Sequence, residues 1–232
     1  MSRTRGALVW GAIVAQLLFT VSWLVGSLAE GRHYRVSAEG ISDLGALTAG
    51  HPWFVLTAQG VAGLLTIAFA LFALGPALAS GGGRRPVAAW LVAATPLGLD
   101  NVWDLFFRLD CRAADPGCVQ SLGSASWHAT GHLAISFLSF PVMVITPSVL
   151  AARFRAVPAW QGYSGFALAF SSVMFIGVIA FIGLHGHDGA GYAERALALA
   201  ASIGLVLLAL ATRRALTGSA DPEPAPLTTA RA

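Results

Sequence analysis

Two pairs of ionisable side chains stand near the ends of consecutive apolar segments. Asp100 and Asp104 are four residues apart. After a short loop, His128 and His132 repeat this spacing. Residues four apart lie on one face of a helix. Carboxylate and imidazole groups placed in this way can bind a divalent metal such as zinc, relay protons, or form hydrogen bonds that fix two packed helices. The pattern leaves these three roles open.

The distance of each side chain from its helix end predicts which of them meet. A short connection makes the two segments neighbours in an antiparallel hairpin. Asp100 lies one helical turn, about 6 Å, deeper in the bundle than Asp104, and His132 lies one turn deeper than His128. We therefore expect Asp104 to face His128. Asp100 should face His132 inside the bundle. The metal hypothesis takes Asp100, His128 and His132 as ligands.

Six further polar residues fall on the same side of the apolar segments and could line one shared chamber. They are Ser42, Asp43, His185, His187, Asp188 and Glu194. An H-x-H spacing is also common in solvated loops, and a glutamate at a helix start suits the positive end of the helix dipole. These residues are candidates for binding a ligand or an ion, and no residue receives a catalytic role.

The composition is that of an integral membrane protein. Hydrophobic residues make up 56% of the chain and charged residues 11%, against about 25% charged residues in soluble domains. All 14 basic residues are arginines, and they form no continuous stripe with interleaved aromatic residues. The expected partner is therefore the lipid bilayer and not a nucleic acid.

Six apolar segments approach or exceed the roughly 20 residues that a helix needs to cross a bilayer. They cover residues 7–26, 53–78, 87–107, 127–151, 163–184 and 192–211. The sequence predicts an all-α fold, a six-helix transmembrane bundle that forms one domain over residues 1–212. Residues 213–232 are rich in Pro, Ala and small polar residues and are expected to form a disordered cytoplasmic tail.

The arginines predict the orientation of the bundle. Nine of the 14 fall on the side of the two termini, close to the segment ends. By the positive-inside rule both termini are expected in the cytoplasm, in a multi-pass protein of the cell membrane. The first apolar run is longer than the 7–15 residues of a signal-peptide core, so we interpret it as an uncleaved helix. All six histidines then lie on the outer side.

Two cysteines lie in the loop between the third and fourth segments. Cys111 and Cys118 flank the turn-forming residues 115–117, Asp-Pro-Gly. Since this loop is expected outside the cell, where disulfides persist, we predict a bridge between them.

Two short motifs resemble those of a known family. Ile-Ser-Asp-Leu-Gly at residues 41–45 and Gly-Tyr-Ala-Glu-Arg at residues 191–195 are similar to segments of the bacterial and archaeal membrane family known as domain of unknown function 998. The resemblance extends from about residue 10 to residue 212. It implies a six-helix membrane bundle, and it brings no established reaction, substrate or cofactor. The family-typical positions are Ser42, Asp43, Gly45, Glu194 and Arg195.

These observations favour a membrane protein whose outer polar chamber binds a lipid headgroup, an ion or a small molecule. One alternative is a metal-dependent intramembrane hydrolase acting on lipids, loosely similar to the alkaline ceramidase and adiponectin-receptor superfamily, although the last segment lacks the H-x-x-x-H motif of those proteins. A second alternative is an accessory structural subunit.

Overall fold

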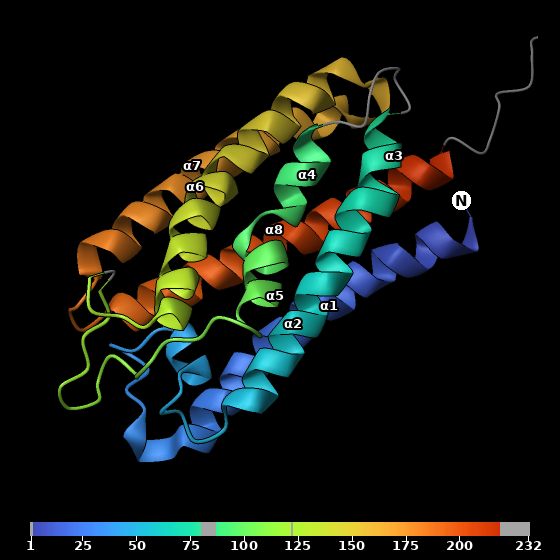
Figure 1. Ribbon diagram of the computed structural model, residues 1–232. Helices are drawn as coiled ribbons and strands as arrows, with labels where there is room; N and C mark the ends of the chain where they lie inside the picture. The colour runs from blue at the N-terminus through green and yellow to red at the C-terminus, as the bar shows by residue number, and fades with distance from the viewer. Residues whose placement is uncertain (1, 80–86, 122, 219–232) are drawn as a thin grey trace, which may run out of the picture.

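A computed structural model describes residues 2–79, 87–121 and 123–218, and all regular structure in these ranges is helical (Figure 1). Five helical stretches in the described ranges are long and apolar enough to cross a membrane. They contain the long helices α1 (Arg3–Glu30), α2 (Pro52–Phe69), α6 (Trp127–Ala156), α7 (Ser164–Leu184) and α8 (Ala190–Gly218). The all-helical fold and the multi-pass membrane character predicted from the sequence are confirmed.

The helices form a closed ring. α1 packs between α2 and α8, α8 packs against α7, and α7 packs against α6. α2 continues through the π-helical turn η3 (Ala70–Leu74) into α3 (Gly75–Ala79), and the 3-10 turn η5 (Pro158–Tyr163) joins α6 to α7. The ring closes through a broken segment, which packs against α6 on one side and α2 on the other.

This broken segment corrects one predicted boundary. Residues 87–107 were expected to form one long helix, but they form α4 (Val87–Ala93), the π-helical turn η4 (Pro96–Asp100) and the single turn α5 (Asn101–Trp103). Pro96 has no backbone N–H and disfavours a helical conformation in the residue before it. Thr95 is accordingly extended, with φ −68° and ψ 167°. The break sets the direction in which Asp100 points.

The last helix is longer than the sequence predicted. α8 continues to Gly218, so residues 213–218 are helical and do not belong to a disordered tail. The rest of the predicted tail, residues 219–232, lies outside the described residues. Figure 1 shows the start of α1 and the end of α8 at the same end of the bundle.

Two loops cover the opposite end of the bundle and interlock. The first contains the short 3-10 turns η1 (Gly31–His33) and η2 (Ser42–Gly45), and the second connects α5 to α6. Arg108 of the second loop donates hydrogen bonds to the carbonyls of Gly45 and Ala46, at 2.8 and 2.9 Å. Leu47 N donates to Leu109 O at 2.9 Å. The two loops therefore form one lid over the helix ends.

A disulfide and a partly buried ion pair hold this lid. Cys111 and Cys118 are bonded, as predicted. Arg112 Nη1 lies 3.2 Å from the carboxylate of Glu30 at the end of α1, and Glu30 also accepts hydrogen bonds from the backbone of Gly50 and His51. One glutamate thus joins the end of α1 to both loops.

Candidate functional site: a buried acidic cavity

A small cavity of about 70 Å³ lies under the lid, between α1, α2, η4, α6 and α8. Its polar lining comes from elements that are far apart in the chain. The polar side chains on its wall are Ser42, Gln59, Asp100, Asn101, Asp104, Ser136 and Glu194. Asp100, Asn101, Asp104 and Gln59 are each less than 10% exposed. The cavity therefore gathers three carboxylates in the interior of an apolar bundle.

Asp104 is paired with His132, which corrects the predicted pairing. His132 Nδ1 lies 2.7 Å from Asp104 Oδ1, and both side chains are buried. His128, the expected partner of Asp104, instead bonds Phe106 O through Nδ1 at 2.9 Å, and its ring lies tilted against that of Trp127 with 3.6 Å between centroids. It is not among the residues that line the cavity.

The register of the hairpin explains this difference. The helical turn α5 ends at Trp103, four residues earlier than predicted. Trp103 Nε1 donates to Gly131 O at 3.1 Å, and its ring stacks on Phe107 with 4.3 Å between centroids. These contacts place Asp104 beside His132, one turn further along α6 than His128.

Asp100 is held by a residue that the sequence analysis did not consider. Ser139 Oγ donates to Asp100 Oδ2 at 2.9 Å, and Asp100 Oδ1 has no hydrogen-bond partner among the described residues. Asp100 and His132, which were expected to face each other, are both buried and interact electrostatically, but their hydrogen bonds go to Ser139 and Asp104. Residues 132, 136 and 139 follow the i, i+4, i+7 spacing of one helix face, and this spacing could have drawn attention to Ser139.

Glu194 completes the acidic lining from α8. The backbone of Ile41 donates a hydrogen bond to its carboxylate, which also interacts electrostatically with Asp43, Arg195 and His132. Gly40 lies directly against this carboxylate, since a Cβ there would overlap Glu194 Oε2. The lid thereby touches the cavity through the Ile-Ser-Asp-Leu-Gly motif.

Arg195, the neighbour of Glu194, anchors the lid to α8. It is 6% exposed and donates to the carbonyls of Val36, Glu39 and Gly191. It also donates to the hydroxyl of Tyr34. Its guanidinium is therefore used to hold backbone oxygens of the lid.

Asp43 and the polar residues before α8 do not line the cavity. Asp43 accepts hydrogen bonds from Gly40 N, Ala113 N and Gln120 Nε2 at 2.7 to 2.9 Å, so it joins the two loops. The predicted candidates between α7 and α8 are exposed and do not line the cavity; they are His185, His187 and Asp188.

The structure does not bring the three predicted metal ligands together. In the ranges that the structure describes, no three His, Cys, Asp or Glu side chains converge so that they could hold a metal ion. The proposed ligand set of Asp100, His128 and His132 is divided, because His128 turns toward Phe106 and Trp127.

Polar groups of the lid have shifted pKa values that reflect its hydrogen bonds. The hydroxyl and the backbone N–H of Ser126 donate to Asp110 and hold the pKa of this carboxyl below its usual value. Hydrogen bonding to Asp115 raises the pKa of Arg112. Burial raises the pKa of Glu39. These shifts reflect hydrogen bonds within the lid and the burial of Glu39 in it.

The five apolar helices and the polar interior define a multi-pass helical membrane protein. A protein-family model described as "Protein of unknown function (DUF998)" matches residues 13–211. The chain belongs to this family, and the resemblance seen in its two short motifs is confirmed. Comparison with curated proteins and with solved structures found no match.

Proposed function

We propose that this protein is a proton-binding membrane protein, in which the cavity lined by Asp100, Asp104 and Glu194 takes up a proton together with bound water. The observation that carries the proposal is the buried, half-satisfied carboxylate of Asp100. Its Oδ1 has no partner in the described ranges, and neither have Asn101 Nδ2 and Gln59 Nε2, whose side chains line the same cavity. Unpaired polar atoms around a polar cavity are the usual setting of buried water.

The size of the cavity selects among the ligands suggested by the sequence. About 70 Å³ holds a few water molecules. A lipid headgroup or a metabolite needs a cavity several times larger. Of the three ligand classes that the sequence left open, the geometry favours the smallest, an ion.

The charges around the cavity favour a proton over a metal ion. Asp104 already has His132 as its partner, Glu194 interacts electrostatically with Arg195, and Asp100 forms no ion pair with any residue that the structure describes. An uncompensated carboxylate in an apolar interior costs several kcal/mol. A proton removes this cost without requiring a coordination shell, whereas a catalytic zinc requires three protein ligands around one point. The hydrolase alternative is therefore less well supported.

Infrared difference spectroscopy on protein in lipid nanodiscs tests the proposal. Acidification should produce a carboxylic-acid C=O band, and Asp100→Asn should remove a component of it. The matched control is Asp188→Asn, which changes an exposed loop carboxylate and should leave the buried-acid component in place. If Asp100→Asn leaves the difference spectrum unchanged, or if sodium at constant pH gives the same spectrum as acidification, the protein does not bind a proton at this site.

We further propose that the chain crosses the membrane six times, with both termini in the cytoplasm. Five crossings alone would leave the ends of the chain on opposite sides, whereas α1 begins and α8 ends at one end of the bundle (Figure 1). The broken segment α4–η4–α5 would supply the sixth crossing. The arginine distribution supports the cytoplasmic side for the termini.

The orientation is tested with topology reporters fused after Ala232. A reporter that works only in the cytoplasm should be active, and one that works only outside it should be silent. The reverse result would place the lid and the acidic cavity on the cytoplasmic side and would contradict the proposed topology.

A further inference from the structure

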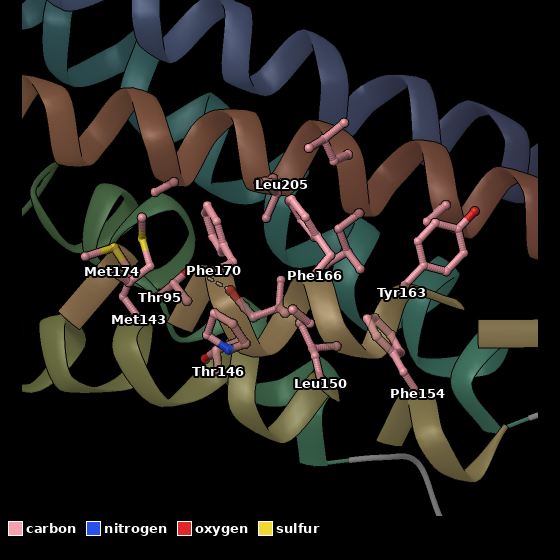
Figure 2. Close-up of a pocket in the computed structure, with 18 of the residues that line it drawn as sticks. Thr95, Met143, Thr146, Leu150, Phe154, Tyr163, Phe166, Phe170, Met174 and Leu205 are labelled. Atoms are coloured by element: carbon pink, nitrogen blue, oxygen red, sulfur yellow. Dashed lines mark hydrogen bonds between the residues drawn. The ribbon is translucent and has the colours of Figure 1, made fainter. Parts of the chain in front are cut away.

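A second and larger cavity lies between α4, α6, α7 and α8, next to the acidic cavity. Its volume is about 390 Å³. Figure 2 shows labelled side chains around it, from Met143 and Met174 at one end to Phe154 and Tyr163 at the other. Its lining is predominantly apolar and aromatic, so it is suited to hydrocarbon and not to the polar ligands considered above.

The cavity opens toward the surface that would contact lipid. Phe166 of α7 and Leu207 and Leu210 of α8 belong to its lining, yet their exposed fractions are 54%, 42% and 36%. Side chains that line the cavity and are also exposed mark the opening of the cavity. A molecule could therefore enter sideways from the bilayer, between α7 and α8.

The length of the cavity matches one lipid chain. Its lining on α8 extends from Ala201 to Arg214. These thirteen residue steps correspond to about 20 Å at the helical rise of 1.5 Å. The hydrocarbon of one membrane leaflet is about 15 Å thick, half of the bilayer core. An extended acyl chain with its polar attachment would fill this length.

Arg214 places a positive charge at the end of this apolar cavity. Its side chain is exposed, and its guanidinium has no hydrogen bond or ion pair with any residue that the structure describes. The neighbouring Arg213 differs, since its guanidinium lies over the ring of Trp10 at 5.4 Å. A free guanidinium at the end of an apolar cavity that is about as long as one leaflet is thick complements a lipid with a negatively charged headgroup.

We propose that this cavity binds one acyl chain of an anionic membrane phospholipid, whose headgroup phosphate contacts Arg214. The two cavities are neighbours, since Leu97, Met143 and Ala201 line both, but none of the three acidic side chains of the proposed proton site lines this one. The occupant would bind as a structural or regulatory lipid from the leaflet near the chain termini.

Native mass spectrometry of the purified protein tests this proposal, with phosphatidylglycerol and phosphatidylcholine of identical chains as the probes. The unsubstituted protein should retain phosphatidylglycerol about five-fold better, the effect of one arginine near a membrane surface. Arg214→Gln should abolish this preference, whereas Arg213→Gln should keep it. Ala167→Phe inserts a ring into the cavity wall and should reduce retention of both lipids.

Val173→Phe is the control for Ala167→Phe, since Val173 is half exposed on α7 and does not line the cavity. The proposal is overturned if the unsubstituted protein retains both lipids equally, if Arg213→Gln and Arg214→Gln lose the preference alike, or if Ala167→Phe retains lipid as well as Val173→Phe does. A dimer that Ala167→Phe disrupts would assign the cavity to a second copy of the chain, which also overturns it. The arginine variants lie on the surface, so they give a result even if Ala167→Phe does not fold.

Discussion

Arg195→Met should lower the stability of the protein by about 4 kcal/mol, because four oxygen atoms lose their donor at once. The arginine donates to three backbone carbonyls and to the hydroxyl of Tyr34. Hydrogen bonds to a charged group contribute about 1.5–3 kcal/mol each, and they do not add fully. For a chain of this length the loss corresponds to a fall of about 10 °C in Tm.

Thermal unfolding followed by tryptophan fluorescence measures this effect. Arg155→Met is the matched control, because Arg155 is an exposed arginine whose Nε reaches only the carbonyl of Ala151, at 3.4 Å. It should shift Tm by no more than a degree or two. Arg195→Lys should lie between the two, since an ammonium group cannot reach all four oxygens. Equal shifts for the two methionine variants would show that Arg195 does not anchor the lid.

The buried pair of Asp104 and His132 should give a strong coupling in a double-mutant cycle. Asp104→Leu leaves a buried imidazole without its acceptor, and His132→Leu leaves a buried carboxylate without its donor. Each single change should cost about 3–5 kcal/mol, because removing one member of a buried pair leaves an uncompensated group. The double variant should cost clearly less than the sum, since both polar groups are then gone.

The cycle is measured by chemical unfolding in mixed micelles. The neutral hydrogen bond between Ser148 and Ser171, at 2.8 Å, joins α6 to α7 and provides the control cycle. Its coupling should be near 0.6 kcal/mol, as for typical hydrogen bonds between membrane helices. Additive effects at Asp104 and His132 would mean that the pair contributes no interaction of its own.

Features that depend on local sequence were predictable. Length and hydropathy located the five long helices, because a membrane helix satisfies its own backbone hydrogen bonds and needs only enough consecutive apolar residues. The bridge between Cys111 and Cys118 was predictable because the two cysteines flank a turn in one short loop. Pro96 was also visible, and its effect on the residue before it could have predicted the break in the third segment.

The partners of the polar side chains depend on helix rotation and register, which a single sequence does not specify. Each residue step turns a helix by 100°, and the π-helical turn η4, which includes Asp100, changes this rotation. The contact between Trp103 and Gly131 then sets the register, so Asp104 meets His132 and Asp100 meets Ser139.

The roles of Glu194 and Arg195 and the apolar cavity depend on contacts between residues far apart in the chain. The sequence placed Glu194 and Arg195 at the start of the last helix, but Arg195 acts on the Val36 carbonyl, 159 residues away in the chain. The apolar cavity has no sequence signature, since its lining residues look like any membrane-facing leucine or phenylalanine. It lies between α4, α6, α7 and α8, and a gap between helices is a property of their packing and not of any one segment.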